Sequence, residues 1–85
     1  MAEPPEMKNK FYEWSNEVFQ KSPFDNKTTN LMSLVAALII GNDGAVSYFY
    51  FSAKKAGAPE AELAGVTDIA AAAVGLNLYT LPPKE

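Results

Sequence analysis

The sequence lacks cysteine and histidine, and each absence removes a class of function. Without cysteine there is no thiolate nucleophile, disulfide, iron–sulfur cluster or thiolate zinc site. Without histidine, the chain lacks both the usual general base near neutral pH and the most common metal ligand. We therefore expect no metal site, no cofactor and no conventional catalytic residue.

Arginine is also absent, which argues against a nucleic-acid partner. The chain has 7 basic residues, all lysine, against 10 acidic residues, and its formal net charge is -3. Binding to a phosphate backbone draws much of its free energy from basic side chains that release counterions. The only adjacent basic pair, Lys54 and Lys55, is typical of a solvated helix face.

Long apolar runs are missing as well. The longest nearly uninterrupted run, LVAALII at 34–40, is well short of the roughly 20 residues that span a bilayer. The start, MAEPPEMKNK, is acidic and contains proline, unlike a secretion signal. We therefore expect no membrane association and a cytoplasmic location, and we interpret the sequon at 26–28 as a helix start.

What the chain does contain is apolar surface. Its 85 residues suffice for one domain, 1–85, and 48% of them are hydrophobic. A domain of this size buries only about 60% of the surface that its unfolded chain exposes. The remaining apolar surface predicts association with other copies of the chain.

The first half of the chain has the pattern of two helices. Apolar residues at spacings of four, three and four predict an amphipathic helix over residues 6–21, entered through Pro4-Pro5, and Ser22-Pro23 ends it. The apolar face of this helix contains Met7, Phe11, Trp14 and Val18. Asp25 or Asn26 then caps a second helix. Its end, 34–40, is apolar all round, which predicts burial on all sides.

The second half is less certain from its pattern. Residues 45–53, AVSYFYFSA, suit either a helix or a strand, since Asp43-Gly44 is also a hairpin signal. Pro59-Glu60 opens a short helix, and Gly65 with Thr67-Asp68 indicates a break before a last helix that begins near Ile69. The chain therefore has the pattern of an all-α domain of about four to five helices.

Three phrases in this order resemble the carboxymuconolactone decarboxylase family, which includes the alkylhydroperoxidase D proteins. The phrases are FDNKTTNLMSLVAALIIG, GNDGAVSYFYFSAKKAGA and APEAELAGVTDIAAAAVG, and together with the first helix that precedes them they extend the resemblance over nearly the whole chain. The resemblance implies a small all-helical fold, with residues 45–53 in a helix. It also implies assembly as a dimer, trimer or hexamer.

The resemblance also locates the family's reactive positions. The family's Cys-x-x-Cys falls on Asn42 and Ala45, its histidine on Phe49, and its upstream glutamate on Asn30. A dithiol peroxidase needs a thiolate, a resolving thiol and groups that move protons. None of the four residues can supply these, so the resemblance implies a pseudoenzyme whose reactive residues are missing.

Three functions remain open. The first is a non-catalytic subunit that assembles with itself or binds a protein partner. The second is a small-molecule binder, whose former active-site cavity would now be more apolar and suit a small apolar ligand unless Phe49 fills it. The third is an enzyme that uses unrelated residues. The polar candidates for a pocket are Asp43, Tyr48, Lys54 and Asp68, although Asn42 or Asp43 could also simply cap its helix.

Overall fold

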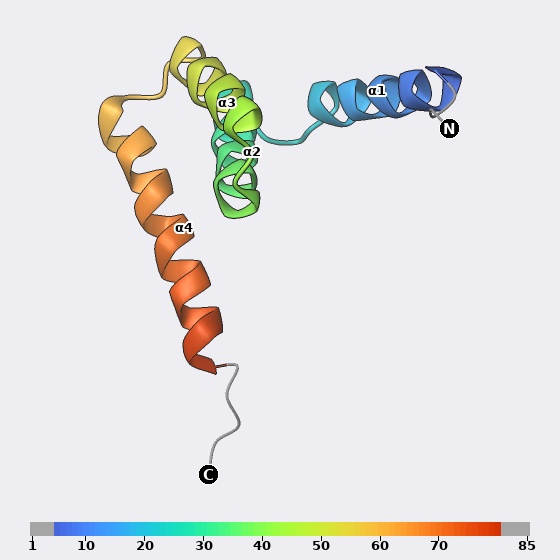
Figure 1. Cartoon of the computed structure of the whole chain (residues 1–85). Coiled ribbons are helices and arrows are strands. Elements are labelled where there is room, and N and C mark those ends of the chain that lie inside the picture. The colour runs from blue at the N-terminus through green and yellow to red at the C-terminus, as the bar shows by residue number, and fades with distance from the viewer. Residues whose placement is uncertain (1–4, 81–85) are drawn as a thin grey trace.

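The computed structural model describes residues 5–80, and in that range it contains four helices and no strand (Figure 1). This confirms the all-α prediction at the lower of the two expected helix counts. The helices are α1 (Pro5–Gln20), α2 (Asn26–Ile40), α3 (Asp43–Lys55) and α4 (Glu60–Thr80).

Short polar residues and glycines set the helix ends. Asp25 is the N-cap of α2, and its Oδ1 accepts a hydrogen bond from the Thr28 N–H at 2.7 Å. Gly41 ends the same helix with a φ of 82°, a left-handed conformation that glycine adopts without a side-chain clash. Gly57, with a φ of 100°, does the same after α3. These ends agree with the sequence pattern.

The ambiguous segment is helical, and the expected break in the last helix is wrong. Residues 45–53 lie inside α3, and α4 runs without interruption through Gly65 and Thr67-Asp68. Leu63, Val66 and Ala70 follow one another at helical spacing and are all buried. Continuous burial of this face outweighs the weak helix propensity of one glycine, which costs about 1 kcal/mol.

The core lies where α2, α3 and α4 meet. The two-residue connection after α2 makes α2 and α3 an antiparallel pair, and α4 packs mainly against α2. Ala53 of α3 is completely buried, and its small side chain lets the helices approach closely. It packs in one cluster with Leu34, Ala58, Leu63 and Val66.

The end of α2 is less buried than its composition predicted. Leu34 and Ala37 are buried, but Ile39 is 52% exposed and Ile40 is 78% exposed. The reason is that α3 and α4 cover only part of the helix circumference. An apolar surface therefore remains open at the end of α2.

Helix α1 extends away from the other three helices (Figure 1). No residue of α1 is buried, and its predicted apolar face is exposed to between 47% and 60% per residue. Its one aromatic contact with the rest of the described chain joins Phe19 to Phe49, with ring centroids 6.0 Å apart. The radius of gyration is 16.0 Å, whereas a compact domain of this length has about 12 Å.

The second half of α4 is also uncovered. No residue of α4 beyond Ala70 is buried, and the helix extends from the α2–α3 pair in a different direction from α1 (Figure 1). By length and composition, α4 is the one described helix that is long and apolar enough to cross a membrane. A core helix of a soluble protein meets the same two criteria of length and composition.

Candidate functional site

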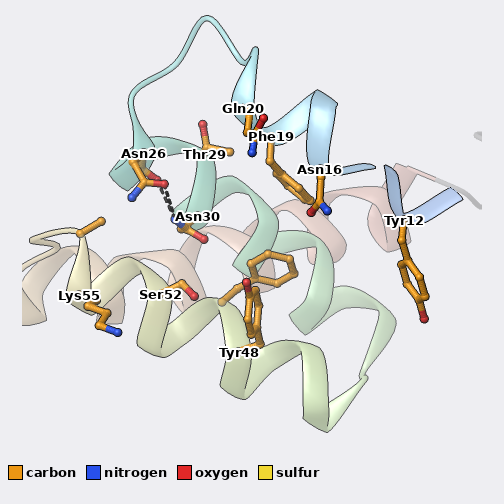
Figure 2. Close-up of a pocket in the computed structure, with 12 residues that line it drawn as sticks. Tyr12, Asn16, Phe19, Gln20, Asn26, Thr29, Asn30, Tyr48, Ser52 and Lys55 are labelled. Carbon is orange, nitrogen blue, oxygen red and sulfur yellow. Dashed lines mark hydrogen bonds between the residues drawn. The ribbon is translucent and has the colours of Figure 1, made fainter. Parts of the chain in front are cut away.

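The largest cleft lies where the end of α1 passes the start of α2 and the second half of α3. It has a volume of about 650 Å³, and Figure 2 shows its side chains converging from these three helices. Ligand-binding pockets commonly have volumes of about 300–1,000 Å³. The lining residues are Tyr12, Asn16, Phe19, Gln20, Asn26, Thr29, Asn30, Tyr48, Phe49, Ser52, Lys55 and Ala56.

Side-chain amides give the cleft its polar character. Asn30 Nδ2 donates to the Asn26 backbone oxygen at 2.9 Å and to Asn26 Oδ1 at 3.1 Å (Figure 2). Both N–H groups of the Asn30 amide are thereby engaged, and its Oδ1 keeps its capacity to accept hydrogen bonds. Asn16 and Gln20 add two more amides from α1. The lining is therefore more polar than the apolar cavity that the sequence led us to expect.

Phe49 forms part of the wall of this cleft and does not close it. The side chain is half-buried and packs against the core cluster. Its ring contacts Phe19 at 6.0 Å and Tyr48 at 5.1 Å between centroids, the latter edge to face. Such aromatic pairs contribute roughly 0.5–1.5 kcal/mol beyond the area that they bury. Phe49 thus joins α3 to α1, at the position where the sequence resemblance places a histidine.

The structure brings two of the four degenerate positions together at the cleft. Asn30 and Phe49 both line it, whereas Asn42 and Ala45 do not. Asn42 is the N-cap of α3, and its Oδ1 accepts a hydrogen bond from the Ala45 N–H at 2.9 Å. Ala45 lies one turn before Phe49 on the same face of α3. The capping role considered for Asn42 is therefore confirmed.

The weaker pocket candidates are dispersed. Tyr48 lines the cleft, but Asp43 is exposed in the first turn of α3, and Asp68 is exposed on α4. Lys54 Nζ lies 3.7 Å from Glu60 Oε1 and 6.0 Å from the centroid of the Tyr50 ring, also outside the cleft. Enzymatic use of these four residues together has no support in this arrangement.

Several residues of the cleft were not predicted. Asn16 and Gln20 lie outside the predicted apolar face of the first helix, and neither they nor Asn26, Ser52 and Lys55 were considered as site residues. Their positions one turn apart do indicate shared faces, Asn16 with Gln20 on α1 and Ser52 with Lys55 on α3. No sequence signal indicated that these faces meet.

The site has little charge. Among the lining residues, Lys55 is the only one with a charged side chain. The described residues 5–80 contain no cluster of three histidine, cysteine, aspartate or glutamate side chains that could hold a metal ion. Nearby, hydrogen bonds from the side chain and then the backbone N–H of Thr28 lower the pKa of Asp25, and the charge of Lys27 adds to this effect. Lowering this pKa keeps the cap of α2 ionised.

Comparison with known proteins gives one match. Residues 5–80 match the model of the carboxymuconolactone decarboxylase family. No curated protein and no solved structure matches the chain. The matched range coincides with the residues that the structure describes, so it includes α1 and the open half of α4 as well as the core.

Proposed function

Because the chain belongs to the carboxymuconolactone decarboxylase family, we propose that it is a non-catalytic member that works in the cytoplasm as a self-assembling subunit. The observation that carries this proposal is the apolar surface that a single copy leaves open. Helix α1 has no buried residue, and α4 has none beyond Ala70. Exposed apolar area of this extent is typical of surfaces that bind other proteins.

The non-catalytic part of the proposal is supported by what occupies the family's reactive positions. Asn42 caps α3 and Phe49 packs between α1 and the core. Ala45 has no functional group, and the Nδ2 of Asn30 is held by Asn26. Each polar or aromatic side chain at these positions therefore has a structural contact in place of a chemical role.

Light scattering coupled to size-exclusion chromatography tests the assembly. We expect a defined species of at least twice the mass of one chain, and a single species with the mass of one chain would overturn the proposal. Assays for peroxide reduction and for decarboxylation of a lactone acid test the non-catalytic part. Turnover above the rate of the Phe49→Ala variant in either assay would contradict it.

A second candidate function is small-molecule binding at the cleft. The observation that favours it is the volume of about 650 Å³, lined both by the rings of Phe19, Tyr48 and Phe49 and by side-chain amides. This lining suits a flat ring with hydrogen-bonding groups at its edge, because aromatic faces stack on the ring and amides pair with the edge. A purely aliphatic ligand would leave these amides unpaired.

Thermal shift measurements with flat heterocyclic compounds test this candidate. We expect stabilisation that Asn30→Ala abolishes and that Asn9→Ala, an exposed amide outside the cleft, leaves unchanged. The same stabilisation in both variants would place the ligand elsewhere. No stabilisation by any compound would exclude the cleft as a site for this class.

A further inference from the structure

We propose that the exposed apolar face of α1 packs on the distal part of α4, residues 71–80, of a second copy of this chain. We call the face formed by Met7, Phe11, Trp14 and Val18 the α1 stripe. This inference rests on the proposed self-assembly and adds which two surfaces meet. Both surfaces belong to the same chain, so each copy offers one of each.

The two surfaces match in length. The α1 stripe spans 11 residue steps, or about 17 Å of helix, and the distal part of α4 spans 9 steps, or about 14 Å. In the structure, α1 and α4 extend from the α2–α3 pair in different directions, so neither covers the other within one copy (Figure 1). Contact between these two surfaces therefore requires a second copy.

The two surfaces also match in side-chain size. The α1 stripe carries the large side chains of Phe11 and Trp14, whereas the distal part of α4 begins with three exposed alanines, 71–73, followed by Val74 and Gly75. Large side chains fit against small ones when two helices interdigitate. Two α1 stripes facing each other would instead oppose four large side chains to four others.

Helix α4 also exposes apolar side chains on more than one side of the helix. Its distal large side chains point around the helix and remain exposed: Val74, Leu76, Leu78 and Tyr79. A helix that is apolar all round is normally buried. Residues 69–80 include no charged side chain, and only Asn77, Tyr79 and Thr80 carry a polar group, so this part presents no charge that would oppose an apolar partner.

The available area favours a reciprocal contact. Large aromatic side chains bury about 150–250 Å² each, so four large side chains that are half exposed offer on the order of 400 Å². With an equal area from α4, one contact buries about 800 Å², which is only the size of a packing contact. Two symmetric contacts bury about 1,600 Å², the area of a standard stable interface, so we assign a two-fold dimer.

Cross-linking between two differently tagged chains tests the pairing, and the absence of native cysteine makes introduced cysteines unique. One chain carries Lys10→Cys beside the α1 stripe, and the other carries Ala73→Cys on α4. We expect a short bismaleimide to join these two chains. The matched controls, Asn9→Cys on the opposite face of α1 and Ala61→Cys at the start of α4, should give at least fivefold less product.

A second variant keeps the test independent of cross-linking chemistry. Because α1 has no buried residue, Phe11→Glu should leave the α2–α4 core folded while weakening dimerisation at least tenfold. The single tryptophan, Trp14, lies in the α1 stripe, so its emission should shift to longer wavelength when the dimer dissociates. Asn9→Glu is the control and should change neither property.

The outcomes separate this inference from the proposed function. A monomer by light scattering overturns both. A dimer or larger species without the Lys10–Ala73 cross-link overturns only the pairing, and preferential Lys10–Lys10 cross-linking shows that α1 pairs with α1 instead. Co-flotation of the wild-type chain with phosphatidylcholine vesicles, lost in Leu76→Glu, would show that lipid covers α4 and would overturn the inference.

Discussion

Replacing Asn42 by alanine should destabilise the protein by about 1 kcal/mol. The Oδ1 of this side chain accepts a hydrogen bond from the Ala45 N–H at 2.9 Å at the start of α3. Loss of an N-cap side chain costs about 0.5–2 kcal/mol, and Asn42 is exposed, so water can partly replace the lost acceptor. For a domain of this size, 1 kcal/mol corresponds to a melting temperature lower by roughly 4–8 °C.

Thermal unfolding followed by circular dichroism measures this effect, at one protein concentration because the proposed assembly would make the melting temperature concentration-dependent. Asn42→Asp is the matched control and should retain most of the stability, because aspartate caps helices as well as asparagine does. Equal losses in the alanine and aspartate variants would refute the capping role. A loss above about 3 kcal/mol would also refute it, because one exposed cap does not contribute that much.

Three further variants probe the core, the wall of the cleft and the cap of α2. Ala53→Leu should cost about 1–3 kcal/mol by overpacking a completely buried site, whereas Ala61→Leu on the exposed start of α4 should be nearly neutral in chemical denaturation. Phe49→Ala should cost roughly 2–3 kcal/mol through lost core and Phe19 contacts, and unchanged stability would contradict its packing role. The pKa of Asp25 is lower in the folded protein than its ordinary value of 3.8. The ionised carboxylate therefore contributes its full stabilising free energy above pH 3.8, and this contribution is lost as the pH falls through the pKa of the folded protein. Asp25→Asn keeps a cap but cannot titrate. Its melting temperature should therefore decrease less steeply than that of the wild type as the pH is lowered below 4. Parallel plots of melting temperature against pH for the two proteins would contradict this.

The sequence predicted the positions of helix ends better than it predicted burial. The stop before Ser22-Pro23 and the Asp25 cap depend on local backbone chemistry, which a short stretch of sequence contains in full. The exposure of Ile39 and Ile40 depends on which helices pass beside them, and no local pattern contains that information. The break expected at Gly65 failed for the same reason, since contacts of Leu63 and Val66 with other helices keep α4 continuous.

The site was predictable only in part. Asn30 and Phe49 were candidates because three phrases of the sequence resemble a known family, and aligning these phrases assigned the two positions without any information on the fold. The amides from α1 were missed, because their place in the cleft depends on the direction in which the chain leaves Lys21–Asp25. That direction is set by tertiary contacts, including the hydrogen bond of 3.1 Å between the Ser22 and Thr29 hydroxyl groups.

The exposed apolar surfaces of α1 and α4 affect how long a newly synthesised chain remains as a folded single copy. Contacts within the core join helices that are close in sequence, and such helical domains fold within microseconds to milliseconds. Pairing of two copies is a second-order process, so its rate depends on concentration. A folded but unpaired copy would therefore persist longest when synthesis is slow, with its apolar helices accessible to chaperones and proteases. Under these conditions the steady-state amount of protein would rise more steeply than in proportion to its rate of synthesis.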